Sequence, residues 1–321
     1  MRKNSLLSMY HDLKESGTQS DFPNILANVM YKVLIAKFRG VNSPWKQYTT
    51  QSDLSDFKQA NRVIVSEAPD LVEIQDDGQY TDSSITDYNY GIQLKTFGRT
   101  FTVGRKTIIN DDLNALRKQP ERFGRAAGRI LAKRVVNAIE GDGLMYDGSR
   151  MFAVAHLNSA NTSLTNDAAG ATAVQAGITA IENSVDPDTN EKYGITARYL
   201  VVGTGLRFIA QQLTRSAQIW PVSTSGGSAQ NVISLEPLVE PFLTSTTAWY
   251  VMADPADLPV VEVGFLNGKE TPDLLMKRAD TVNMAGGEDE YGYDFDEIFY
   301  KVRYDFAVAR AQWQGIYRGK A

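Results

Sequence analysis

The side chains best placed to do chemistry in this chain of 321 residues are five cations at helical spacing. They are Lys118, Arg122, Arg125, Arg129 and Lys133. Steps of three and four residues place side chains on one face of an α-helix. Residues 105–134 hold nine basic against three acidic side chains, and such a surplus attracts phosphate without reading a base sequence. A solvated face that only keeps the protein soluble is the alternative interpretation.

Two histidines and a glycine turn are the candidates for catalysis. Gly203 and Gly205 stand between an apolar run and a helical pattern, as in a dinucleotide-binding turn, but Phe208 occupies the place of the third glycine. His11 lies near the N-terminus, and His156 has no recognisable nucleophile motif nearby, so we expect a structural role for His156. A nucleotide-dependent enzyme is therefore the weakest of the functions considered.

Acidic side chains offer little as ligands. The loop at residues 286–297 lacks the spacing of a calcium-binding loop. Asp111 and Asp112 precede a helical pattern, where capping is the expected role. Cysteine is absent, which excludes disulfides, thiolate metal sites and cysteine nucleophiles. We expect no metal and no cofactor.

Composition describes a globular chain whose charge is local. With 43% hydrophobic residues the chain can bury a large core, and its net charge of −5 disfavours a protein that binds nucleic acid over its whole surface. The sequence shows no secretory signal and no apolar run long enough to span a membrane, so we expect no membrane partner. The length predicts about two domains.

Two helices and a hairpin must position these candidates. The pattern predicts a helix over residues 120–140 that opens at Pro120 and ends before Gly141. Its apolar stripe is predicted to contain Phe123, Ala127, Ile130, Leu131, Arg134, Val135 and Ala138. An amphipathic helix between Asp21 and Gly40 either docks on a neighbouring subunit or packs on its own chain.

The pattern of residues 62–106 predicts a long hairpin. Residues 63–65 and 71–74 favour strands, residues 76–84 are rich in turn formers, and a later phase slip predicts a bulge near Gly98. A hairpin of this kind has little core of its own, so it either moves freely or lies on another molecule. The middle of the chain alternates strands with helices, the last third is rich in strands, and residues 223–231 have the composition of a loop.

Five runs, occurring in the expected order, are similar to the major capsid protein of tailed bacteriophages, particularly the Mu-type head subunits. They are TQSDFPNILANVMYKVLIAKF, GRTFTVGRKTIINDDLNAL with the helix after it, MFAVAHLN, RYLVVGTGLRFIAQQL and YKVRYDFAVARAQWQGIYR. The resemblance covers nearly the whole chain. It implies an α+β, Hong Kong 97-like capsid fold with an N-terminal arm, an extended E-loop hairpin, a peripheral domain built on a long spine helix, and an axial domain.

The resemblance also implies where these parts lie. The arm is expected at residues 1–45, the E-loop at 62–100, the peripheral domain at 46–61 and 101–149 with its spine helix at 120–140, the axial domain at 150–255, more peripheral strands and a loop at 256–302, and a C-terminal closing strand at 303–321. Inter-subunit contacts are expected from Phe22, Ile25, Val29 and Val33 in the arm, and from Asp76, Asp77, Gln79, Tyr80 and Asp82 at the E-loop tip. The basic helix face is expected to look inward, near DNA.

The function implied is structural and not enzymatic. Copies of the chain are expected to form pentamers and hexamers of an icosahedral shell around double-stranded DNA, in the virion and, during assembly, in the host cytoplasm. The further partners implied are portal, scaffold or protease proteins, with decoration proteins as an option. An encapsulin-type protein nanocompartment is the alternative within the same fold. Because residues 70–94 contain no lysine, we expect an E-loop that acts without a covalent cross-link.

Overall fold

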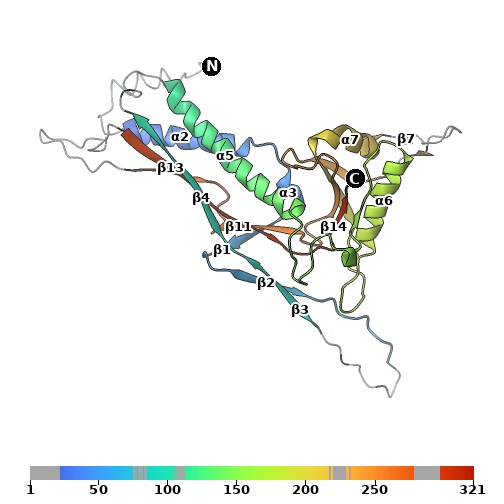
Figure 1. The fold of residues 1–321 in the computed structure, drawn as a ribbon. Helices are drawn as coiled ribbons and strands as arrows, with labels where there is room; N and C mark the ends of the chain where they lie inside the picture. The colour runs from blue at the N-terminus through green and yellow to red at the C-terminus, as the bar shows by residue number, and fades with distance from the viewer. Residues whose placement is uncertain are drawn as a thin grey trace, which may run out of the picture. The chain divides into compact units, whose positions relative to one another are not determined.

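The computed structural model describes residues 22–74, 78, 82, 85–104, 106, 113–216, 218–219, 229–230, 233–277 and 297–321. The chain forms two compact units (Figure 1). The first comprises residues 1–41, 96–130 and 269–305, and the second comprises residues 42–95, 131–268 and 306–321. No described helix is long and apolar enough to cross a membrane.

Two helices and three strands build the described part of the first unit. They are α2 (Phe22–Arg39), the first part of α5 (Leu113–Glu140), β4 (Lys95–Gly104), β12 (Asp273–Met276) and the first part of β13 (Glu297–Arg310). β13 pairs antiparallel with β12 and also pairs with β4. Phe101 of β4 stacks on Phe123 of α5 and on Tyr300 of β13, with ring centroids 4.9 and 5.1 Å apart. Met30 and Leu34 of α2 belong to the same buried cluster.

Two glycines let α2 and α5 approach closely. A Cβ atom at Gly124 would lie 2.3 Å from the carbonyl oxygen of Leu34, and one at Gly128 would lie 3.0 Å from that of Phe38. Glycine in a helix costs about 1 kcal/mol relative to alanine. The close contact between the helices explains why the sequence keeps both glycines despite that cost.

Two predictions about the long helix are wrong. α5 begins at Leu113, so Pro120 lies inside the helix instead of opening it. An interior proline loses one hydrogen bond and its ring crowds the carbonyl four residues back, so proline favours a helix start, but it does not exclude an earlier one. Arg134 is exposed, whereas Val136 and Ile139 are buried. The buried face is therefore wider than the predicted stripe.

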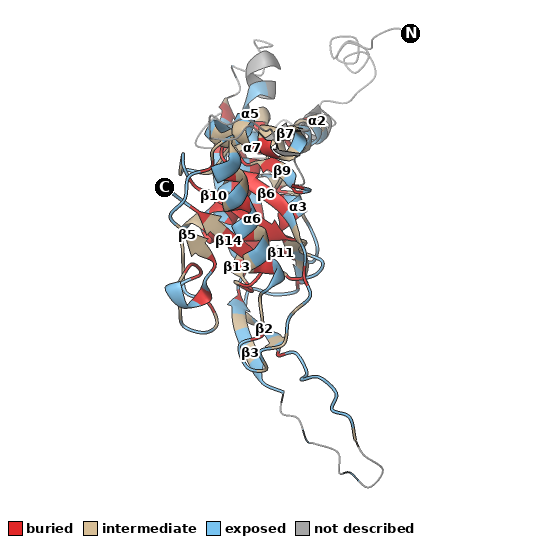
Figure 2. Ribbon diagram, turned by 90° about the vertical axis from the view of Figure 1, so that its right-hand side faces the viewer, coloured by how far each residue is buried: buried red, intermediate tan, exposed pale blue. Residues whose placement is uncertain are grey.

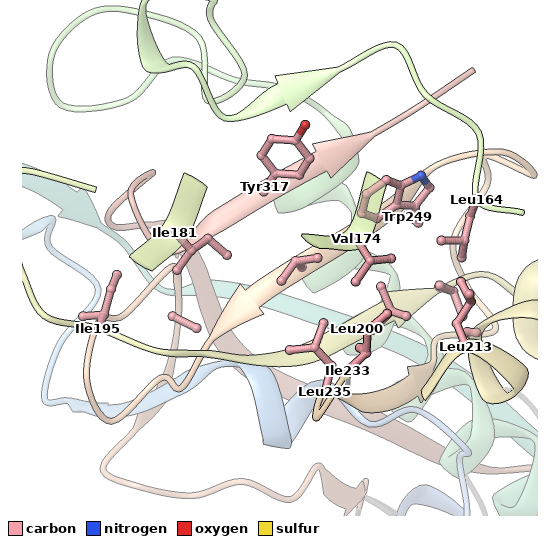
Figure 3. Close-up of a cluster of buried hydrophobic side chains, with 14 of the residues drawn as sticks. Leu164, Val174, Ile181, Ile195, Leu200, Leu213, Ile233, Leu235, Trp249 and Tyr317 are labelled. Carbon is pink, nitrogen blue, oxygen red and sulfur yellow. The ribbon is translucent and has the colours of Figure 1, made fainter. Parts of the chain in front are cut away.

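A five-stranded sheet forms the centre of the second unit. Its order is β5 (Ser159–Ala160), β14 (Ile316–Gly319), β10 (Trp249–Ala253), β6 (Ala197–Val202) and β9 (Glu236–Val239). β10 and most of β6 are fully buried (Figure 2), as expected for continuous apolar runs at the middle of a sheet. Helices α6 (Ala168–Glu182) and α7 (Arg207–Arg215) contribute Val174 and Leu213 to the core with Leu200, Trp249 and Tyr317 (Figure 3).

The C-terminal part of the chain differs from the prediction. β13 is continuous from Glu297 to Arg310, so the predicted boundary at residue 303 cuts through a strand. Only β14 corresponds to a separate C-terminal strand, and it pairs antiparallel with β10, which lies in the range expected for the axial domain, residues 150–255. The sequence of β13 does not signal the change of unit, because apolar residues keep the same alternation from Val302 to Val308, whereas in the structure the buried positions change phase at Phe306 and Ala307.

The hairpin lies in the second unit. β2 (Ala60–Val65) pairs antiparallel with β3 (Asp87–Ile92), and Figure 1 shows the two strands side by side. β1 (Thr50–Leu54) runs parallel to β11 (Val261–Leu266), which pairs antiparallel with residues 306–310. The remaining short elements are α3 (Trp45–Tyr48), η1 (Val154–His156), η2 (Thr204–Leu206), β7 (Gln218–Ile219) and β8 (Ala229–Gln230).

Two smaller features complete the comparison with the sequence. The strands break at Gln93 and Leu94, between β3 and β4, whereas β4 is continuous through Gly98, and the bulge near Gly98 stays a prediction. Gly98 allows a close approach in the first unit, since a Cβ there would lie 2.8 Å from the carbonyl oxygen of Val302. Within the predicted loop at 223–231, residues 229 and 230 form β8, paired with β7; the other predicted loop residues lie outside the described ones.

Candidate assembly interfaces

The arm helix α2 packs on its own chain through one stripe. Met30 and Leu34 are buried in the core of the first unit, and Lys37 lies 3.7 Å from Glu121 of α5. Val29 and Val33 are only half-buried. The side chains of Phe22 and Ile25 lie outside the described residues, although both positions are helical. Of the two alternatives left open by the sequence, packing on the chain itself accounts for Met30 and Leu34.

The cationic face exists as a continuous feature of α5. At 100° per residue, Lys118, Arg122, Arg125, Arg129 and Lys133 fall within an arc of about 80° and extend over about 22 Å. All five side chains are exposed, and none forms an ion pair with a residue that the structure describes. Glu121, the acid closest to them in sequence, contacts Lys37 instead. These charges are available to an anionic partner.

The base of the hairpin is held to β11, within the same unit, by the buried carboxylate of Glu262. Arg62 and Tyr90 stand opposite each other on β2 and β3. Both donate to Glu262 of β11, the Arg62 Nε at 3.0 Å and the Tyr90 hydroxyl at 2.6 Å. Burial, followed by this hydrogen bond, raises the pKa of Tyr90. One acidic side chain therefore binds both strands at the same level.

A second anchor lies further along the hairpin. The turn after α6 contains Asp186 and Asp188. Asp186 accepts from the backbone N–H of Glu67 at 3.1 Å, and Asp188 accepts from the Tyr88 hydroxyl at 2.8 Å. The hydrogen bond to Asp188 raises the pKa of Tyr88 to about 12. Burial alone would raise the pKa of Asp186, but hydrogen bonds from backbone amides outweigh it and lower that pKa.

The hairpin tip is largely outside the described residues. This applies to Asp76, Asp77, Gln79 and Tyr80. Asp82 is described and is exposed. The location of the tip stays a prediction, and sequence reasoning missed the anchors at Glu262, Asp186 and Asp188. Signals for them exist: Glu262 interrupts the apolar run VVEVGFL, and residues 185–190, VDPDTN, have the composition of a turn closed by aspartate side chains.

The catalytic candidates occupy structural positions. His156 is buried, and its ring stacks on Trp313 with centroids 3.9 Å apart while Nε2 lies 2.7 Å from Asp147 Oδ2. Gly203 precedes η2 at the end of β6, and Gly205 lies within η2. Among the described residues no group of three or more histidine or acidic side chains is placed to hold a metal ion. Asp111, Asp112 and the acidic loop at 286–297 fall mostly outside that part of the chain.

Comparison with known proteins identifies the family. The family described as phage capsid protein matches residues 88–319. This chain belongs to the phage capsid protein family. The match begins within β3 and ends with β14, so it includes β4, α5, α6 and all later strands. No curated protein matches the sequence.

Three solved structures with a similar fold come from phages. A chain from Microbacterium phage Oxtober96 gives a TM-score of 0.57 at 12% identity and covers 87% of this capsid protein and 91% of that chain. A chain from Mycobacterium phage Adephagia gives a TM-score of 0.56 at 11% identity and covers 90% of this chain and 89% of its own length. The capsid structure of cyanophage P-SCSP1u gives a TM-score of 0.56 at 11% identity and covers 87% of this chain and 88% of its own length. The predicted Hong Kong 97-like fold is confirmed, while the Mu-type subgroup stays a prediction.

The family decides the class of function. Phage capsid proteins are structural proteins of the virion, and this chain is a major capsid protein that assembles into a multimeric shell. The nanocompartment and enzyme alternatives are therefore set aside. The candidate surfaces described above, the arm helix, the cationic face and the hairpin, are then candidates for contacts within a shell.

Proposed function

We propose that this capsid protein forms pentamers and hexamers of an icosahedral head that encloses double-stranded DNA. The observation that carries the proposal is the hairpin. Its base is bound to the chain at two levels, through Glu262 and through Asp186 with Asp188, yet residues 67–73 beyond the base are exposed. A segment presented in this way gains stability only by lying on another molecule.

Contacts between copies are assigned to the hairpin tip and the arm. Asp76, Asp77, Gln79, Tyr80 and Asp82 would reach a neighbouring subunit without a covalent cross-link. In the arm, Val29 and Val33 remain half-exposed after Met30 and Leu34 have packed on the chain itself, so they, with Phe22 and Ile25, would contact a second copy. Portal, scaffold or protease proteins, and optionally decoration proteins, would join during assembly in the host cytoplasm.

The cationic face of α5 is assigned to the packaged DNA. Five exposed side chains without an ion pair in the described part of the chain give attraction that weakens with salt. A chain that is acidic overall, with one limited basic strip, holds DNA loosely. That is suitable for a container into which DNA must move.

Electron microscopy of the purified protein tests the assembly. We expect closed shells, either from the protein alone or with its scaffold. A protein that stays monomeric under every condition, scaffold included, would overturn the proposal. Copurifying DNA supports the phage head, whereas shells filled with an enzyme would contradict it.

The DNA contact is tested by salt dependence. Replacing Arg122, Arg125 and Arg129 with glutamine should lower the slope of log K against log salt for double-stranded DNA by about three. The matched control replaces three exposed cations elsewhere, Lys58, Arg207 and Lys320, with glutamine. Equal slopes for the two triple variants would remove the cationic face from the account and leave shell assembly untouched.

A further inference from the structure

Among the described residues, the large aliphatic side chains with the greatest exposure occur in two groups of the second unit. One is the limb of the hairpin beyond its base, where Leu71 is 101% and Val72 is 68% exposed. The other is the loop at residues 141–158, where Val154 is 91% and Leu157 is 79% exposed. A heterologous contact between identical subunits needs two different surfaces of one chain, and these two groups supply them.

The loop at 141–158 is rigid even though it carries exposed aliphatic side chains. The stacked pair of His156 and Trp313 braces it, and the Asn158 side-chain amide donates to the carbonyl oxygens of Met151 and Trp313 at 2.9 and 3.3 Å. The Phe152 N–H donates to Asp142 at 2.9 Å. The backbone of such a loop loses little conformational freedom when a partner binds.

Leu157 is at a position that the isolated chain does not explain. Its φ is 53°, a left-handed conformation that glycine or asparagine adopts more easily than leucine. Its N–H donates to the Val154 carbonyl, which ties the two residues to one short turn. Val154 and Leu157 are thus two exposed apolar side chains on the same turn, and neither gains stability from its exposure.

Charge complements this apolar surface. Arg150 is exposed, forms a β-bridge with Leu144, itself 70% exposed, and has no ion pair with a described residue. On the hairpin limb the order is Asp70, Leu71, Val72, Glu73, an apolar pair between two exposed acids. Exposed apolar side chains on a loop that also carries Arg150 complement an apolar pair that is flanked by two carboxylates.

We infer that residues 70–73 of one copy dock on the loop surface formed by Leu144, Arg150, Val154 and Leu157 of a second copy. The inference rests on the proposed function, because it assigns one contact within the shell. A few aliphatic side chains bury far less than the roughly 1,200 Å² of a stable free-standing complex. A contact of this size is sufficient where many copies are held together at once, which favours a second capsid subunit over a separate protein.

Engineered cysteines test the contact, since the chain has no cysteine of its own. The variant Val72→Cys with Val154→Cys is assembled and treated with oxidant or with a short bis-maleimide. Each single variant can join at most two copies, whereas a heterologous contact in the double variant joins copy after copy. We expect a ladder of covalent oligomers above the dimer under denaturing conditions. Val72→Cys with Phe208→Cys, a similarly exposed position on α7, is the control and should give no ladder.

The outcomes separate this inference from the proposed function. Shells without a ladder, both for this pair and for Leu71→Cys with Leu157→Cys, overturn the inference and leave the capsid function standing. Failure of the unmodified protein to form shells would overturn the proposed function instead. In the cross-linking variant, Arg150→Glu should lower the ladder yield at least threefold, and adding Asp70→Arg with Glu73→Arg should restore it. A ladder yield that is the same in all of these charge variants contradicts the assigned pairing.

Discussion

The arm helix α2 and the hairpin of β2 and β3 are held to the chain by opposite kinds of contact. In the first unit, α2 buries Met30 and Leu34 and closes on Gly124 of α5, so shape and apolar area hold it. In the second unit, the hairpin is held by carboxylates, from Glu262 and Asp186. Apolar packing depends on volume, whereas a carboxylate contact is directional and depends on pH. The position of the arm helix therefore depends on close apolar packing, whereas the orientation of the hairpin depends on a few hydrogen bonds and one ion pair.

Leu34→Ala should have the largest effect on stability. Leu34 is fully buried, with 0% exposure, and such a truncation costs about 3 kcal/mol. Urea unfolding of unassembled subunits measures the loss. Lys32→Ala, an exposed residue on the same helix, is the control and should change the free energy of unfolding by less than about 0.5 kcal/mol. Equal effects would mean that α2 does not pack through this stripe.

Gly124→Ala comes next. The added Cβ would lie 2.3 Å from a backbone oxygen that cannot move aside freely, so we expect a net destabilisation of about 1 to 2 kcal/mol despite the better helix propensity of alanine. Gly104→Ala, where a Cβ would meet nothing within 4 Å, serves as the control in the same unfolding experiment. A stabilised Gly124→Ala protein would contradict close contact between α2 and α5.

Glu262→Gln should act locally on the hairpin. The substitution removes the charge that binds Arg62 and weakens the bond from Tyr90, so amide hydrogen exchange in residues 60–65 and 87–92 should accelerate by about tenfold, or about 1.4 kcal/mol. Glu236→Gln, at an exposed position on β9, should leave these amides unchanged. A uniform acceleration over the whole unit would show that Glu262 supports the core and not the hairpin.

The smallest effect is the pH dependence of the second anchor. The pKa of Asp186 is lower in the folded chain than its ordinary value of about 3.9. The stability that it contributes is thus present above that value and is lost as pH falls through the folded pKa. Protection of the Glu67 amide should exceed that of Asp186→Asn at pH 6. The difference should begin to shrink as pH falls below about 4 and should vanish only below the folded pKa of Asp186. A difference that grows on acidification would reverse the assignment.

Local pattern was enough to predict some of these elements. The periodicity of α5 and of α2, and the turn composition between β2 and β3, were sufficient to predict two helices and a hairpin. The start of α5 was not predictable, because proline allows a helix start without requiring one. The face exposing Lys118 to Lys133 was predictable for the same reason as the helix itself, since charge and apolar residues share one period.

Local signals single out Glu262 and the aspartates of residues 185–190, but the partners that they hold in the hairpin were beyond sequence reasoning. Arg62 and Glu262 are 200 residues apart, and Tyr90 and Glu262 are 172 apart. No local pattern states which strand will bring a partner to a buried acid. The strain at Leu157 was equally hidden, since the sequence around it does not show a left-handed residue. These are the features that only a folded chain makes visible.

Electron cryomicroscopy of the assembled shell, at a resolution that shows side chains, tests the central claim most directly. The account predicts that α2 lies on α5 of its own chain, while the hairpin beyond Ser66 and Thr86 lies on a neighbouring copy. A shell in which the hairpin folds back onto its own chain, with α2 exchanged to a neighbour, would contradict it.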